Sequence, residues 1–168
     1  MARKKDYREL LKTPFDSGVR NFTGIAKYFL YFAPSIDSAH SAGILDNARS
    51  DEVLTRMLDH SSMTEKTRIL QRIQQASWRN SQFDDYVIDF EESRILCDRY
   101  KTENELHALL RHIRNALAHG YIYVWKKKNG NYILLIDFDS GKNKTTAKIL
   151  VTPSIMEQWK AELENEIA

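Results

Sequence analysis

The sequence has few of the residues that break helices or crosslink chains: its 168 residues include three prolines, six glycines and one cysteine. A lone cysteine, Cys97, excludes an internal disulfide and favours a reducing cytoplasm. No apolar run reaches the roughly 20 residues that a membrane-spanning helix needs, and Lys27 interrupts the most apolar stretch, from Ile25 to Ala33. We therefore expect a cytoplasmic protein that does not enter a membrane.

The chemical motifs of several enzyme classes are also missing. The sequence has no glycine-rich phosphate loop and no Gly-x-Ser-x-Gly nucleophile motif. Its histidines and single cysteine lack the paired spacing of a zinc site, so we expect no metal and no cofactor. The net charge of +2 is too small to indicate a nucleic-acid binder by itself, although Lys126, Lys127 and Lys128 form a basic run.

The length and the 42% apolar content suit one domain with a single core. Apolar residues recur at helical spacing through the first two thirds of the chain, and at strand spacing after that. We expect a mainly α fold: an up-and-down helical bundle over about 16–120, a three-stranded antiparallel meander over about 121–151, and a last helix over about 153–167. The predicted helices of the bundle cover residues 19–32, a short segment from 50, a segment from 62 to about 76, 83–100 and 102–119.

The ends of these elements carry recognisable residues. Ser62 with Glu65, and Thr102 with Glu105, have capping-box spacing, and Gly120 stands where a glycine commonly ends a helix. The Asn-Gly pair at 129–130 predicts a two-residue hairpin turn between the first two strands. The segment 35–50 has no clear period and is open to interpretation as helix or loop.

The helix after Thr102 has an unusual polar face. On a helical wheel, this face lies opposite the apolar stripe and carries alanines, Ala108 and Ala118, where a solvated helix would more often carry Lys and Glu. We interpret it as a surface that meets a partner helix across a polar seam. The polar residues on this face are Arg111, Arg114, Asn115 and His119, while His107 and His112 on the outward side are interpreted as surface residues.

The segment Arg114-Asn115-Ala116-Leu117-Ala118-His119 resembles the motif of the HEPN superfamily, an Arg followed after four to six residues by a His, with a polar residue after the Arg. The resemblance covers about residues 19–121, with the strands as an extension. It implies a HEPN-like bundle, a homodimer through the Arg114–His119 helix, and a metal-independent endoribonuclease whose cleft is formed by two facing motifs.

The residue types suit that chemistry. A histidine such as His119 can take the proton of the RNA 2′-hydroxyl or protonate the leaving oxygen, and Arg114 can hold the phosphate. The expected products are a 2′,3′-cyclic phosphate and a 5′-hydroxyl. Asn115 would orient the catalytic pair or the phosphate, and Arg111 with the lysine run at 126–128 would hold the RNA backbone.

Tyr121 extends the resemblance to HEPN toxins that are paired with a nucleotidyltransferase antitoxin, which adds AMP to a tyrosine at the matching position. Such a chain would act as a toxin or a phage-defence effector. The alternative for Tyr121 is simply the first residue of a strand, where aromatic residues are common.

Two other functions stay open at this point. The first is a non-catalytic HEPN-like module that binds RNA, nucleotide or a protein partner. The second is a helical adaptor unrelated to HEPN, in which His119 only complements the dipole at the end of its helix.

Overall fold

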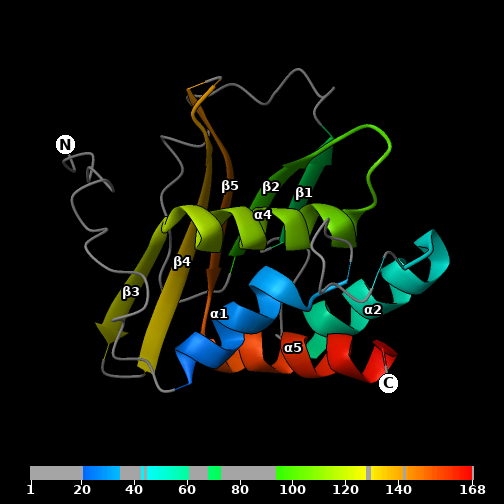
Figure 1. Ribbon diagram of the computed structural model, residues 1–168, viewed down its shortest axis with the longest axis horizontal. Helices are drawn as coiled ribbons and strands as arrows, with labels where there is room; N and C mark the ends of the chain where they lie inside the picture. The colour runs from blue at the N-terminus through cyan, green and yellow to red at the C-terminus, as the bar shows by residue number, and fades with distance from the viewer. Residues whose placement is uncertain are drawn as a thin grey trace.

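A computed structural model of the chain describes residues 21–34, 43, 45–60, 68–72, 94–127, 130–141 and 143–167 (Figure 1). The helices are α1 Phe22–Tyr31, α2 Asn47–His60, α4 Glu105–His119 and α5 Pro153–Ile167. The strands are β1 Arg68–Arg72, β2 Arg94–Arg99, β3 Ile122–Lys127, β4 Gly130–Asp139 and β5 Lys144–Val151.

The strands form one five-stranded sheet in the order β1-β2-β5-β4-β3. The three C-terminal strands pair antiparallel in chain order, β3 with β4 and β4 with β5, and β2 pairs antiparallel to the other edge of β5, with Cys97 opposite Ala147. Strand β1 pairs parallel to β2, with Ile69 opposite Leu96. The sheet is therefore larger than a hairpin meander and has strands from both halves of the chain.

The expectation of a mainly α fold with a three-stranded meander is wrong, because the fold is mixed α/β. Strand β2 falls within the predicted helix 83–100, and β1 falls within the helix predicted from Ser62. The segment Ile95-Leu96-Cys97 is buried on both faces of the sheet, and a short, continuous apolar run of this kind has no period that separates strand from helix. Residues 62–67, 73–76 and 83–93 of these two predicted helices lie outside the described part of the chain.

Helix α4 lies between the sheet and the other helices (Figure 1). It crosses the strands and contacts β4, β2 and β5 on one side, and it contacts α1 and α2 on the other. The predicted apolar stripe of α4 is confirmed, since all its members are buried: Leu106, Leu109, Leu110, Ile113 and Leu117. Because it contacts both layers, α4 has little solvent-facing surface over most of its length.

Both ends of α4 have specific backbone partners. Asn104, rather than the predicted Thr102, caps the first turn, since its side-chain oxygen accepts a hydrogen bond from the His107 backbone N–H at 2.8 Å. Gly120 ends the helix as predicted, in the left-handed conformation with φ of 73°, which a residue with a Cβ adopts at a cost. Its N–H donates to the carbonyls of Ala116 and Leu117.

Other predicted boundaries differ by a few residues. Gly130 belongs to β4 and pairs with Lys127, so it is not the second residue of the hairpin turn; residues 128–129 lie outside the described part of the chain. Helix α2 begins at Asn47, within the segment 35–50 and ahead of the predicted start. Helix α5 begins at Pro153 as predicted, and Thr152 caps it by accepting from the Ile155 N–H.

Among the residues that the structure describes, Trp159 on α5 is the largest of the fully buried side chains. Its indole N–H donates to the backbone carbonyl of Met57 at 2.9 Å, which links α5 to α2 inside the core. Among the described residues, no helix combines the length and apolar character that crossing a membrane requires.

Trp159→Ala is expected to lower the free energy of unfolding by about 3–5 kcal/mol, because it leaves a large cavity and removes the hydrogen bond to the Met57 carbonyl. The matched control is Ile167→Ala on the same helix, whose side chain is 43% exposed and whose loss should cost within about 0.5 kcal/mol. Urea unfolding followed by far-ultraviolet circular dichroism measures both values. Equal losses would contradict the assignment of Trp159 to the core.

Candidate functional site

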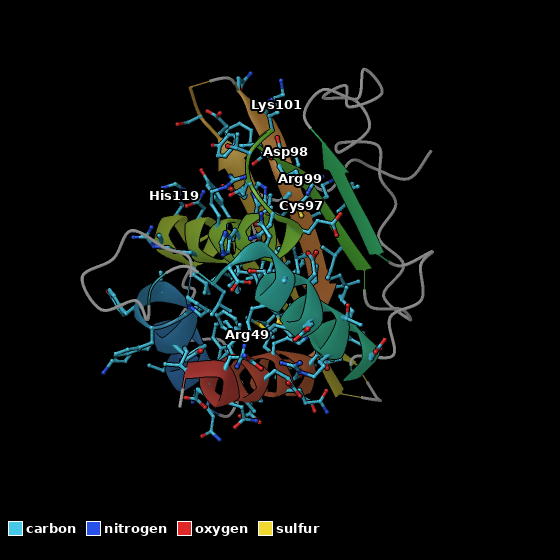
Figure 2. The ribbon with its side chains drawn as sticks, turned by 90° about the vertical axis from the view of Figure 1, so that its right-hand side faces the viewer. Arg49, Cys97, Asp98, Arg99, Lys101 and His119 are labelled. Carbon is cyan, nitrogen blue, oxygen red and sulfur yellow. The ribbon has the colours of Figure 1, made fainter. Side chains whose placement is uncertain are left out.

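The Arg-x4-His motif lies on the C-terminal half of α4. Arg114 and Asn115 are half-buried, and His119 is exposed in the last turn. Figure 2 shows His119 at the end of α4, away from Asp98, Arg99 and Lys101. Five residues of helix separate Arg114 from His119 by about 7.5 Å along the axis and about 140° around it. The two side chains of one copy therefore leave the helix in different directions.

The exposed end of α4 is followed by a row of aromatic rings. The His119 ring lies edge-on to Tyr121, with centroids 6.4 Å apart, and Tyr121 lies 6.3 Å from Phe138 of β4. The backbone of Tyr121 is fixed on both sides, since its N–H donates to Ala116 and its carbonyl accepts from the Ile136 N–H. Tyr121 is half-buried and precedes β3 directly.

Much of the polar face of α4 packs against the sheet. Ala108 and His112 are completely buried, and Asn115 contacts β4. The interpretation of this whole face as a seam for a partner helix, and of His112 as a surface residue, is therefore wrong. Ala118 and His119 are the members of the face that are exposed, and Arg114 is partly so.

His112 is held between two aspartates. Its Nδ1 lies 2.7 Å from Asp137 Oδ2 on β4, and its Nε2 lies 2.7 Å from the backbone oxygen of Asp98 on β2 and 3.1 Å from Asp98 Oδ1. Because both ring nitrogens face acceptors, both must carry a proton, and the imidazole is a buried cation. The guanidinium of Arg111, 3.3 Å from Nε2, donates to Glu103 instead.

The pKa values of this pair follow from its surroundings. Burial acts to lower the pKa of His112, but the hydrogen bonds to Asp137 and Asp98 outweigh it, so that the pKa is raised above the ordinary 6.5. Burial acts to raise the pKa of Asp137, and the hydrogen bonds from His112 and Asn115 outweigh that effect and lower it below 3.8. Each group therefore stabilises the charged form of the other.

Arg111 lies in an ion-pair network. Its Nε and Nη2 donate to the two carboxylate oxygens of Glu103 at 2.7 and 2.9 Å, and its guanidinium stacks over Tyr100 at 4.1 Å. Arg111, which the sequence predicts to contact RNA, is therefore already paired with Glu103 and Tyr100. These partners precede α4, whereas the motif lies in its C-terminal half. Of the predicted lysines, Lys126 and Lys127 belong to β3, but their side chains lie outside the described part of the structure, as does residue 128.

Asn115 is brought together with a residue that sequence analysis did not select. Its side-chain N–H donates to Asp137 Oδ2 at 3.0 Å, the oxygen that also accepts from His112. Asp137 follows four apolar residues in β4 and is only 4% exposed. A carboxylate in a buried strand requires compensating partners. An aspartate directly after four apolar strand residues is therefore the sequence signal that could have identified Asp137.

A cavity of about 600 Å³ lies at the opposite end of α4 from His119. It is lined by the first turns of α2 and α4 and by the loop after β2, including Asn47, Asn104, Arg99 and Lys101. Neither Arg114 nor His119 lines this cavity. Within the described part of the chain, no three His, Cys, Asp or Glu side chains are grouped so that they could hold a metal ion.

The sequence model of the HEPN pEK499 p136 family matches residues 43–165. The chain belongs to this HEPN family. No curated protein and no solved structure shows significant similarity to it. The matched region runs from α2 to α5 and includes β3, β4 and β5, so the strands are part of this HEPN domain rather than an extension of it. HEPN domains are often ribonucleases, and the Arg-x4-His motif of this one reaches the exposed end of α4.

The stability of this HEPN domain is expected to depend on pH through His112 and Asp137. The contribution of His112, whose pKa is raised, is complete below 6.5 and is lost as the pH rises through the raised value. The contribution of Asp137 is complete above 3.8 and is lost as the pH falls through the lowered value. The pair stabilises the fold most between these two limits.

Asp137→Asn should cost about 3–5 kcal/mol, because it leaves a buried imidazolium without its carboxylate, and should flatten the loss of stability at alkaline pH. Urea unfolding over about pH 5–9 tests both effects. Glu157→Gln, which removes an exposed carboxylate from α5, is the control. An unchanged alkaline slope in Asp137→Asn would show that another group causes the pH dependence.

Proposed function

We propose that this HEPN domain is a metal-independent endoribonuclease that acts as a homodimer, with Arg114 and His119 of both copies in one cleft. The observation that supports it is that a chain of the HEPN family keeps both motif residues on α4, with His119 exposed in the last turn. An exposed imidazole, and on the same helix an arginine without an ion pair among the described residues, suit a site that receives an anionic substrate.

The chemistry requires two proton transfers. As the 2′-oxygen forms a bond to phosphorus and the bond to the 5′-oxygen breaks, one group takes the 2′-hydroxyl proton and another protonates the leaving 5′-oxygen. A single imidazole does not serve both positions in one step, whereas the His119 side chains of two copies can. The products are a 2′,3′-cyclic phosphate and a 5′-hydroxyl.

Arg114 has the complementary role. Its guanidinium can donate two hydrogen bonds to the phosphate and stabilise the negative charge that grows on the phosphate oxygens. Within one copy, Arg114 and His119 leave α4 about 140° apart. A second copy that packs against the exposed end of α4 would place one chain's arginine near the other chain's histidine.

The biological role that fits such an activity is a toxin or phage-defence effector. Under this proposal Tyr121, next to His119, is the residue on which a nucleotidyltransferase-type antitoxin would place AMP. A bulky, charged group at that position would occupy the space that the RNA needs.

A binding module without activity is the second candidate. It is favoured by the position of the 600 Å³ cavity, which is away from the motif. RNA cleavage separates the two candidates.

His119→Ala and Arg114→Ala are each expected to lower the rate of RNA cleavage at least about a hundredfold, since each removes a proton-transfer or charge-stabilising group. The assay is cleavage of bulk RNA by the purified chain in excess EDTA, with end-group analysis for cyclic phosphate. The control is Lys27→Ala, an exposed cation on α1, which should cut at the wild-type rate. Cleavage by His119→Ala at that rate would refute the site.

Ala118→Glu is expected to weaken the dimer and cleavage together, because it puts a charge on the exposed end of α4 without touching the core. Sedimentation equilibrium reports the mass, and the same cleavage assay reports activity. Ala161→Glu places the same charge on the exposed side of α5 and should leave both unchanged. A monomeric Ala118→Glu that still cuts fully would argue against a shared cleft.

A further inference from the structure

The cavity at the N-terminal end of α4 is lined almost entirely by polar side chains. Its volume of about 600 Å³ is within the range of small-molecule sites in proteins, and among the described residues that line it Leu54 alone is apolar. Two cationic residues of its lining, Arg99 and Lys101, lie away from His119 (Figure 2). The cavity is therefore separate from the Arg-x4-His motif and suits a polar ligand.

Arg99 brings into this lining a cation that has no carboxylate partner in the described part of the chain. The side chain is half-buried, and its Nε is inaccessible to solvent and has no hydrogen-bond acceptor. Its Nη1 donates to the backbone carbonyl of Glu103 at the long distance of 3.4 Å, while both carboxylate oxygens of Glu103 accept from Arg111. A partly buried guanidinium without an anion is unfavourable, and an anion bound in the cavity would compensate its charge.

Other positively charged groups meet at the same place. Lys101 adds a second cation to the lining, and Asn104 and Glu105 bring to it the N-terminus of α4, whose dipole favours an anion. Arg72 ends β1 and is paired in register with Arg99, which ends β2. Two arginines thus stand at the carboxyl end of the parallel strand pair, the edge at which open α/β sheets bind ligands.

Neutral hydrogen-bond donors complete the lining. Asn104 Oδ1 accepts from the His107 backbone N–H at 2.8 Å, so the NH₂ group of Asn104 is the one that donates to Asn47 Oδ1 at 3.2 Å. The NH₂ group of Asn47 is thereby available as a donor, as is the hydroxyl of Thr102. Oxygen atoms of a bound anion can accept from both.

Two carboxylates restrict the kind of anion. Asp51 of α2 and Glu105 of α4 line the same cavity, so the lining is not uniformly basic. A nucleic-acid strand carries a charge at every phosphate and would bring several of them close to these carboxylates. A ligand with one phosphate group can contact the cationic side alone, and the planar donors of a guanidinium match phosphate oxygens in pairs.

We propose that this cavity is a second binding site, which takes one phosphate group, either inorganic phosphate or the phosphate of a small phosphomonoester. Arg99 is its principal ligand and donates to two phosphate oxygens, and Lys101, Thr102 and Asn47 supply further donors. The site lies at the opposite end of α4 from the motif and does not depend on the proposed nuclease activity.

Backbone amide shifts locate the binding. The full ¹⁵N-labelled chain is titrated at pH 7 with inorganic phosphate and with ribose 5-phosphate, each against sodium chloride of equal ionic strength. The amides of Lys101, Thr102 and Glu105 should shift and saturate with either probe. Tighter binding of ribose 5-phosphate would identify a phosphomonoester as the ligand, and equal binding would identify free phosphate. An RNA oligonucleotide that shifted these amides more strongly than both probes would overturn the proposal.

Substitutions identify the groups that bind. Arg99→Met should weaken binding by about ten- to a hundredfold, the value of a charge-assisted hydrogen bond, and Lys101→Ala, at an exposed position, by roughly three- to tenfold. Lys27→Ala, which removes an exposed cation from α1, and Arg114→Ala should bind both probes as the unaltered chain does. Unchanged binding by Arg99→Met and Lys101→Ala would overturn the site.

Thermal unfolding separates a binding role of Arg99 from a structural one. Without phosphate, the Tm of Arg99→Met should not fall, because the guanidinium that it loses has no carboxylate partner. Phosphate should raise the Tm of the unaltered chain and leave that of Arg99→Met unchanged. A lower Tm of Arg99→Met without phosphate would assign this residue to the fold and overturn its role as a ligand. Shifts confined to amides near Arg114 and His119 would also overturn the proposal, and would leave the proposed nuclease site intact.

Discussion

The ion pair between His112 and Asp137 is the contact on which the arrangement of this HEPN domain depends. A cationic imidazole and a carboxylate are both removed from water between α4 and β4, with a separation of 2.7 Å and a second aspartate on the other ring nitrogen. Each charge would be unfavourable alone, and the pair is tolerated because every nitrogen of the ring has an acceptor. Apolar side chains could fill the same volume, but they would not fix the rotation of α4 against the sheet.

That rotation decides which residues of α4 reach solvent. Its apolar stripe belongs to the core that the other helices share with the sheet, and His112 faces β2 and β4. Only toward the C-terminal end, where α4 extends past its buried contacts, do Ala118 and His119 become exposed. His112 and His119 are seven residues apart and therefore lie on nearly the same side of α4; His112 is buried against the sheet, and His119 is exposed because it lies in the last turn.

Local chemistry allowed much of this fold to be predicted from the sequence. The apolar stripe of α4, its end at Gly120, the meander strands and the start of α5 at Pro153 all follow from period and cap residues. The position of β2 could not be predicted in this way, because Ile95-Leu96-Cys97 is buried on both faces and shows no alternation of apolar and polar residues. The partners of His112 and Asn115 could not be predicted from the sequence either. Asp98 and Asp137 are distant from them in sequence, and only the sheet brings these aspartates to α4.

The polar packing of α4 does not follow from a helical wheel. A wheel assigns burial to the apolar residues alone, whereas α4 contacts both helices and strands and also buries His112. Alanine next to histidine and asparagine then indicates close packing against a strand as readily as against a partner helix. The half-buried Asn115 lies between these buried residues and the exposed end of α4, with its amide N–H bound to Asp137 of β4. Residues at such borders are where the packing of a fold can set the chemistry of a surface.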